Sequence, residues 1–131
     1  MSELRADTIT ASDGTSPVTL TGQTAAKAHG LTDQKTGGTQ TLRTSFNVSS
    51  ISDGGTGLTD YSLTSSMSIS LYTVVLGVDT DLASYSGNTM LADPAGGNMT
   101  SSVVPVKNCE TSTGGDQDQE YTSMCVMGDL A

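Results

Sequence analysis

The chain contains the run Leu42-Arg43-Thr44-Ser45-Phe46-Asn47-Val48 and, shortly after it, the run Asp53-Gly54-Gly55-Thr56-Gly57. From Leu42 to Val48, Leu, Thr, Phe and Val share one face and alternate with polar or charged residues, a period typical of a half-buried strand. The apolar phase shifts by one at Ile51, as it does at a bulge or a strand end. Alternation resumes at Tyr61 and Leu63. The pattern predicts a β-hairpin that turns within residues 53–57.

Strand-like segments also precede this hairpin. Residues 4–10 and residues 18–21 carry β-branched and apolar side chains in extended patterns, and the turn formers of residues 11–17 separate them. The stretch Gln23–Ala28 is the best candidate for a helical turn, which Gly30 would end.

Downstream, two neighbouring segments predict strands of different character. Met67, Ile69 and Leu71 share one face and alternate with serines, which predicts a half-buried strand. Residues 71–78 are apolar on both faces, so we expect a strand buried on both sides. This strand is predicted to lie at the centre of the domain or of a subunit interface.

The C-terminal third predicts two further strands separated by loops. Residues 103–106 are predicted to form an edge strand, because Pro105 cannot donate a ladder hydrogen bond. Residues 121–127 are predicted to close the fold, with Met124 and Val126 facing away from Cys125 and Met127. Residues 83–99 are rich in Gly and Asn, and residues 111–120 are polar and acidic, so both segments are expected to be loops.

Composition agrees with an all-β fold that has a thin core. The chain has 131 residues, of which 21 are Thr, 18 Ser and 15 Gly, and only 34% are hydrophobic. Globular domains average roughly 45–50% apolar residues, so we expect oligomerisation to bury further surface. We predict an extended N-terminal arm, residues 1–28, followed by a small β-sandwich head of short antiparallel strands, residues 29–131.

Charge divides the chain in a similar way. Residues 1–43 carry four acids and four bases, whereas residues 44–131 carry ten acids and the single base Lys107. This division indicates an arm that docks and a head that faces solvent. The net charge of −9 and pI of about 4.1 argue against a nucleic-acid partner, since such proteins cluster Lys and Arg.

Membrane insertion is not expected from the sequence. No run approaches the roughly 20 apolar residues that span a bilayer. The N-terminal residues carry no apolar run typical of a secretory signal, and the C-terminal residues show no prenylation box.

Residues with catalytic or ligand chemistry are few. His29 is the only histidine, and its distance in sequence from Cys109 and Cys125 matches no zinc pattern, so we expect it to be a surface or packing residue. No serine lies in a nucleophile-elbow motif, and catalysis is not expected. We predict no cofactor.

Two alternatives stay open at this point. Cys109 and Cys125 could form a disulfide, although two free thiols are favoured in the absence of a secretory signal. The alternating acids of residues 116–120, with Asp79 and Asp81, could bind Ca²⁺, although a solvated acidic loop is the commoner outcome and the twelve-position calcium loop is not matched.

The N-terminal string of residues 1–21, Met-Ser-Glu-Leu-Arg-Ala-Asp-Thr-Ile-Thr-Ala-Ser-Asp-Gly-Thr-Ser-Pro-Val-Thr-Leu-Thr, resembles small virion proteins of tailed bacteriophages, especially marine phages. Further similarity lies in residues 25–28, in residues 45–53, in Gly55-Thr56-Gly57 and in the ending Gly128-Asp129-Leu130-Ala131. The similarity covers the first half of the chain and its terminus. The chain departs from the family after Ala28, where the family commonly has an aromatic-containing stretch.

The resemblance implies a non-enzymatic virion component that forms a homotrimer and is displayed on the particle surface after assembly in the host cytoplasm. The first hypothesis is a capsid decoration protein that contacts the major capsid protein. The alternative is a short tail fibre or receptor-binding tip, for which residues 83–120 would contact a host surface glycan. A carbohydrate-active enzyme is the third hypothesis, and it lacks a convincing acid pair.

Specific residues are predicted for each contact. The residues expected to dock the arm are Leu4, Ile9, Val18 and Leu20. The residues expected to mediate self-association are Phe46, Tyr72, Val74 and Leu76.

Overall fold

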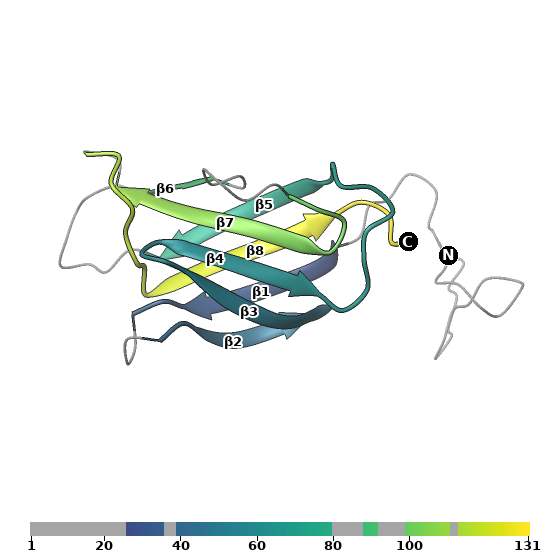
Figure 1. The fold of residues 1–131 in the computed structure, drawn as a ribbon, viewed down its shortest axis with the longest axis horizontal. Coiled ribbons are helices and arrows are strands. Elements are labelled where there is room, and N and C mark those ends of the chain that lie inside the picture. Colours follow the sequence, from purple (N-terminus) through teal and green to yellow (C-terminus); the bar gives the residue numbers. More distant parts are fainter. Residues whose placement is uncertain (1–25, 36–38, 80–87, 92–98, 111–112) are drawn as a thin grey trace, which may run out of the picture.

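A computed structural model describes residues 26–35, 39–79, 88–91, 99–110 and 113–131. These residues form two antiparallel sheets that pack face to face (Figure 1). The first, here called the β1 sheet, has the order β2-β1-β8-β5. Its strands are β1 (Ala26–Asp33), β2 (Thr41–Phe46), β8 (Tyr121–Met127) and β5 (Thr73–Asp79). The second, the β4 sheet, has the order β3-β4-β7-β6. Its strands are β3 (Val48–Gly55), β4 (Leu58–Leu63), β7 (Val103–Glu110) and β6 (Asn88–Leu91).

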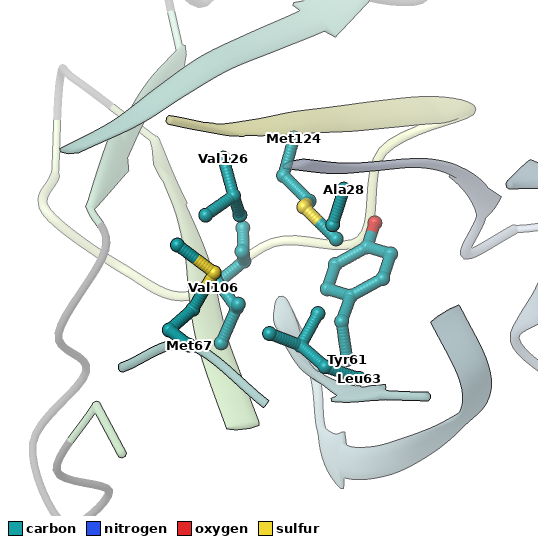
Figure 2. Close-up of a cluster of buried hydrophobic side chains, with 8 residues drawn as sticks. Ala28, Tyr61, Leu63, Met67, Val106, Met124 and Val126 are labelled. Carbon is teal, nitrogen blue, oxygen red and sulfur yellow. The ribbon is translucent and has the colours of Figure 1, made fainter. Parts of the chain in front are cut away.

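The hydrophobic core lies between the two sheets and is small. Its buried members are Ala28, Tyr61, Leu63, Met67, Val104, Val106, Met124 and Val126. Figure 2 shows Met124 and Val126 of β8 pointing from one sheet towards Tyr61 and Leu63 of the other. Tyr61 is the largest of the fully buried side chains, and full burial of a residue of this size is worth about 2–3 kcal/mol. The all-β fold of short antiparallel strands is confirmed for the described residues.

A single asparagine makes the corner where the chain passes from one sheet to the other. Asn47 separates β2 from β3 and has a φ of 55°, in the left-handed region that Asn tolerates better than most residues. Its Nδ2 donates to the carbonyl oxygens of Lys27 at 3.0 Å and Ser65 at 3.1 Å. Its Oδ1 accepts from the Ser65 backbone N–H at 2.7 Å. These bonds join the corner to both neighbouring segments.

The predicted hairpin and the predicted closing strand are both present. β3 and β4 pair antiparallel, and Gly57 completes the turn between them with a φ of 72°. Gly57 has no room for a side chain, since a Cβ there would lie 2.6 Å from the Asn108 carbonyl oxygen. In β8 the burial alternates as predicted, with Met124 and Val126 buried and Cys125 and Met127 half-buried.

The expected helical turn over residues 23–28 is wrong where the structure describes it. Residues 26–28 begin β1, and Ala28 is fully buried in the core. The sandwich therefore includes residues 26–28, which were expected to belong to the arm. Backbone pairing with β8 from Ala26 onwards outweighs the weak helical preference of this short stretch. Residues 1–25, with Leu4, Ile9, Val18 and Leu20, lie outside the described residues.

The expectation that Leu42 to Val48 share one face is also wrong. The chain leaves the β1 sheet at Asn47, and the pairing of β1 with β2 shifts between Leu31 and Thr32. As a result, Leu42 packs against the core while Phe46 is 56% exposed on the outside.

The serine-rich segment with Met67, Ile69 and Leu71 does not form a strand. It connects the two sheets, and its backbone bonds go elsewhere: Met67 N–H donates to Ser101 O at 2.7 Å, and Ser68 N–H to Asp129 O at 2.8 Å. Met67 is buried, but Ile69 and Leu71 are 60% and 79% exposed.

Two strands differ from the sequence-based prediction in whether they lie at the edge or inside a sheet. β5, expected at the centre, is an edge strand of the β1 sheet, and Val75 is half exposed. β7, expected at an edge, lies between β4 and β6. Pro105 is tolerated there because β6 pairs with β7 only from Lys107 to Glu110, so that Pro105 has a described partner strand on one side only.

The two expected loops have different outcomes. Within residues 83–99, residues 88–91 form β6, while residues 83–87 and 92–98 lie outside the described part of the chain. Residues 113–120 form a loop with one isolated bridge, between Cys109 and Asp116.

Candidate functional site

The outer face of the β1 sheet carries a row of side chains that crosses all four strands. The pairing registers place Phe46 beside His29, His29 beside Cys125, and Cys125 beside Val75. We call these four residues the outer row. They point away from the core because their chain neighbours Ala28, Met124 and Val126 are the buried members of β1 and β8.

The outer row has an accessible apolar side chain at each end. Phe46 is 56% and Val75 51% exposed, at the two opposite edges of the sheet. The ring of His29 stacks on that of Phe46, with centroids 6.0 Å apart and an angle of 26° between the planes. A sheet face that exposes apolar side chains is a candidate interaction surface.

A shallow open depression lies beside the outer row. The residues that line it are His29, Gly30, Leu31, Val75, Leu76, Gly77, Ser123, Met124 and Cys125. Gly77 pairs with Ser123 across β5 and β8, and neither has a bulky side chain. The hollow therefore spans β1, β8 and β5 on the outer face of the sheet, with β8 between the other two strands.

A second cluster, buried and polar, joins the two sheets elsewhere in the sandwich. Asn108 Nδ2 donates to Gln34 Oε1 and to Thr122 Oγ1, each at 2.7 Å. Gln34 Nε2 donates to Thr59 Oγ1 at 2.9 Å, and the Gln119 N–H donates to Gln34 Oε1 at 2.9 Å. The members Gln34, Thr59, Asn108, Gln119 and Thr122 are all neutral amides or hydroxyls. Since none titrates near neutral pH, the cluster offers no general acid or base.

Acidic side chains on or near the loop of residues 113–120 have structural partners. Lys107 Nζ lies 2.7 Å from Asp116 Oδ1, and this hydrogen bond raises the pKa of Lys107. Asp118 Oδ1 accepts the Gly57 N–H at 2.6 Å. Among the residues that the structure describes, no group of three or more His, Cys, Asp and Glu side chains could hold a metal ion.

One ion pair joins a buried acid to an accessible base. Asp33 is fully buried, and its Oδ2 lies 2.5 Å from Nη2 of Arg43, whose side chain is 44% exposed. The hydrogen bond to Asp33 raises the pKa of Arg43. The Lys35 N–H donates to the other carboxylate oxygen at 3.0 Å, so this acid is held as a structural anion rather than presented to a cleft.

The residues predicted for self-association are divided by the structure. Phe46 belongs to the outer row, whereas Val74 and Leu76 pack against the core from the inner face of β5. Tyr72 is half-buried, and its hydroxyl donates to the carbonyl oxygens of Thr100 at 2.9 Å and Val103 at 3.1 Å. Both cysteines are free thiols on different sheets, Cys109 on β7 and Cys125 on β8.

The sequence alone does not single out the outer row as a unit. The alternation of residues 121–127 had placed Cys125 opposite the buried Met124 and Val126, which was the available signal. Its partners His29 and Val75 required knowledge of which strands are neighbours.

Comparison with protein families, curated proteins and solved structures found no match to this chain. None of the described residues forms a helix that is long and apolar enough to cross a membrane.

Proposed function

We propose that this protein is a non-enzymatic structural component of a tailed-phage virion, a decoration protein displayed on the capsid surface. The observation that carries the proposal is the outer row, because it exposes two large apolar side chains across one face of a small sandwich. Such a face is suited to contact with other proteins. The resemblance of residues 1–21 to phage virion proteins supplies the particle as the setting.

The chemistry of the described residues supports a structural role over catalysis. The buried polar cluster holds neutral groups only, and the acids Asp33, Asp116 and Asp118 each bind a neighbouring donor. These acids therefore stabilise the fold and its loop. None of these acids lines the depression on the β1 sheet. A glycosidase would need two carboxyl groups that face each other across such a hollow.

A short tail fibre or receptor-binding tip is the second candidate. It is favoured by the acidic loop of residues 113–120, which lies at the surface. Loops on a rigid β scaffold commonly carry recognition, and a host surface glycan would then be the ligand.

Immunogold electron microscopy separates the two candidates. Antibodies against the purified chain are expected to label the heads of particles of the phage that encodes it. Label on the tail alone would overturn the decoration role and favour the fibre. Binding of fluorescent protein to host cells, tested in parallel, is expected only for the fibre.

Separate docking and display parts are a further element of the proposal. The described sandwich begins at Ala26, so removal of residues 1–21 leaves every described strand intact. We expect the truncated chain to associate into the same number of copies as the full chain in solution. We also expect it to lose attachment to the virion. A truncated chain that no longer self-associates would contradict this division.

Self-association itself has two candidate symmetries. The resemblance implies three copies, and the geometry of β5, argued below, favours two. Light scattering of the full chain distinguishes them, since one copy has a mass of 13.3 kDa.

A further inference from the structure

One edge of the β1 sheet, that of β5, has no further strand beside it in the described part of the chain. β5 pairs with β8 without interruption from Thr73 to Asp79, and no described strand pairs with its other edge. Its sequence Thr-Val-Val-Leu-Gly-Val-Asp contains no Pro and no Lys. Natural edge strands are commonly protected by such residues, by bulges or by short length.

The other three edges of the sandwich differ from β5 in this respect. β2 has a register shift against β1 and carries Arg43. β3 has two register shifts against β4. β6 is only four residues long. Among the described strands, β5 therefore offers the edge best suited to accept another strand.

β5 also carries apolar side chains on each of its two faces. Val75 is 51% exposed on the outside, and Val74 and Leu76 are partly buried against the core on the inside. A strand added at this edge would cover apolar side chains on both sides of the sheet, and its own side chains must match this pattern. The strand with the same pattern is β5 itself.

We propose that β5 pairs antiparallel with β5 of a second copy of this chain, about a twofold axis that passes midway between the two copies of Leu76. In an antiparallel pair, residues opposite each other point to the same face of the sheet. The inner faces of the two copies therefore stay together only when even-numbered residues of β5 lie opposite even-numbered residues of the partner's β5. Of these, the register with Leu76 opposite the partner's Leu76 pairs all seven residues of the strand. The two β1 sheets become one continuous sheet of eight strands.

The fit of side chains supports this register. Val75 lies opposite the partner's Gly77, and both positions belong to the outer face. Gly77 has no side chain, so the valine of the other copy meets no opposing side chain at this position, and the twofold axis repeats the contact.

The inference does not depend on the virion role, and its test is the solution mass of the purified full chain. We expect light scattering to give twice the 13.3 kDa of one copy, and Val75→Lys to reduce it to one copy. Phe46→Lys is the matched control, because Phe46 lies in the same outer row, is similarly exposed and lies at the opposite edge. It is expected to leave the dimer intact. Circular dichroism of each variant establishes that it is folded.

Other masses would overturn the proposal. A monomeric native chain, or a trimer that Val75→Lys leaves intact, would exclude pairing through β5. Loss of association in Phe46→Lys with retention in Val75→Lys would place the contact at the β2 edge. The immunogold result is unaffected in each case, so failure of this proposal is distinguishable from failure of the virion role.

Cysteine cross-linking tests the register. In a Cys125→Ser background, Leu76→Cys is expected to give a disulfide-linked dimer on a non-reducing gel, since the two copies of this residue lie opposite each other. Val75→Cys is the matched control and is expected to remain uncross-linked, because two positions of offset exceed the reach of a disulfide. Cross-linking at Val75→Cys instead would overturn the register, and cross-linking at neither would overturn the pairing.

Discussion

Asn47 and Ser65 bind each other through two hydrogen bonds, from the Ser65 N–H to Asn47 Oδ1 at 2.7 Å and from Asn47 Nδ2 to the Ser65 carbonyl oxygen at 3.1 Å. Asn47 lies at the corner between the two sheets, and Ser65 lies just after β4. The pair therefore ties the corner to the end of the neighbouring hairpin. Both of its members were hidden in the sequence among many similar polar residues.

Replacement of Asn47 should destabilise the sandwich. Asn47→Ala loses the amide bonds to Lys27 and Ser65 and forces alanine into the left-handed region at φ 55°. Alanine adopts left-handed backbone less readily than asparagine, which adds a part of the roughly 1–2 kcal/mol that this conformation costs, and the three lost hydrogen bonds cost about 1 kcal/mol each. We expect the free energy of unfolding to fall by about 2–4 kcal/mol in urea titrations.

A glycine at the same position separates the two causes. Asn47→Gly removes the amide bonds but adopts a positive φ freely. It is expected to lose less stability than Asn47→Ala. Equal losses in the two variants would show that backbone conformation at the corner contributes nothing.

The ion pair of Arg43 with Asp33 should matter more than that of Lys107 with Asp116. Asp33 is fully buried, whereas the side chain of Asp116 is 37% exposed and can be solvated after its partner is removed. Arg43→Ala removes the guanidinium that binds a buried carboxylate and should lower the urea midpoint clearly, and Lys107→Ala should lower it only slightly. Adding Asp33→Asn to Arg43→Ala should recover part of the loss. Similar midpoints for the two single variants would contradict this ranking.

Alkaline pH should destabilise the protein through Tyr61. Burial raises the pKa of Tyr61 to about 12, above the ordinary value of 10.0. The unfolded chain therefore loses the phenol proton first, and the stability contributed by neutral Tyr61 is complete below pH 10 and is lost as the pH rises towards 12. A difference of about two pKa units corresponds to about 2–3 kcal/mol.

Tyr61→Phe is the control for this effect. The variant lacks the hydroxyl that donates to the Thr122 carbonyl oxygen at 3.3 Å, so it should be less stable than the native chain at pH 8 by about 1 kcal/mol. Its stability should fall less between pH 8 and pH 11.5 in urea titrations. The remaining fall is expected from Tyr72, whose pKa burial also raises to about 12. An unchanged pH dependence would refute the assignment to Tyr61.

The sequence predicted those features that rest on local patterns. Tyr61 and Leu63 alternate with polar residues on the return strand of the hairpin, and both are buried as that period requires. Met124 and Val126 are buried for the same reason. Where alternation, turn chemistry and one buried face agree, the strand and its inward face follow from the sequence alone.

Features that depend on strand order were not accessible in this way. β5 is apolar on both faces, which indicates burial on both sides, yet it lies at an edge. Pro105 indicates an edge strand, yet β7 has a neighbouring strand on both sides. Pro105 is tolerated because β6 is short and pairs with β7 only beyond this residue. The outer row likewise exists only because four strands from distant parts of the chain adopt one register. Local propensity carries no information on such long-range pairing.

Two adjacent valines of β5 should respond differently to the same substitution. Val74 packs against the core, whereas Val75 is 51% exposed on the outer face. Val74→Asp places a charge against apolar neighbours, and we expect it to lower the free energy of unfolding by several kcal/mol and to lose association through unfolding. Val75→Asp should have a urea midpoint close to the midpoint that the native chain approaches at low protein concentration. It should be monomeric in light scattering, because pairing would bring two carboxylates to the shared edge. A folded monomer from Val74→Asp would place Val74 in the contact between copies rather than in the core of one copy.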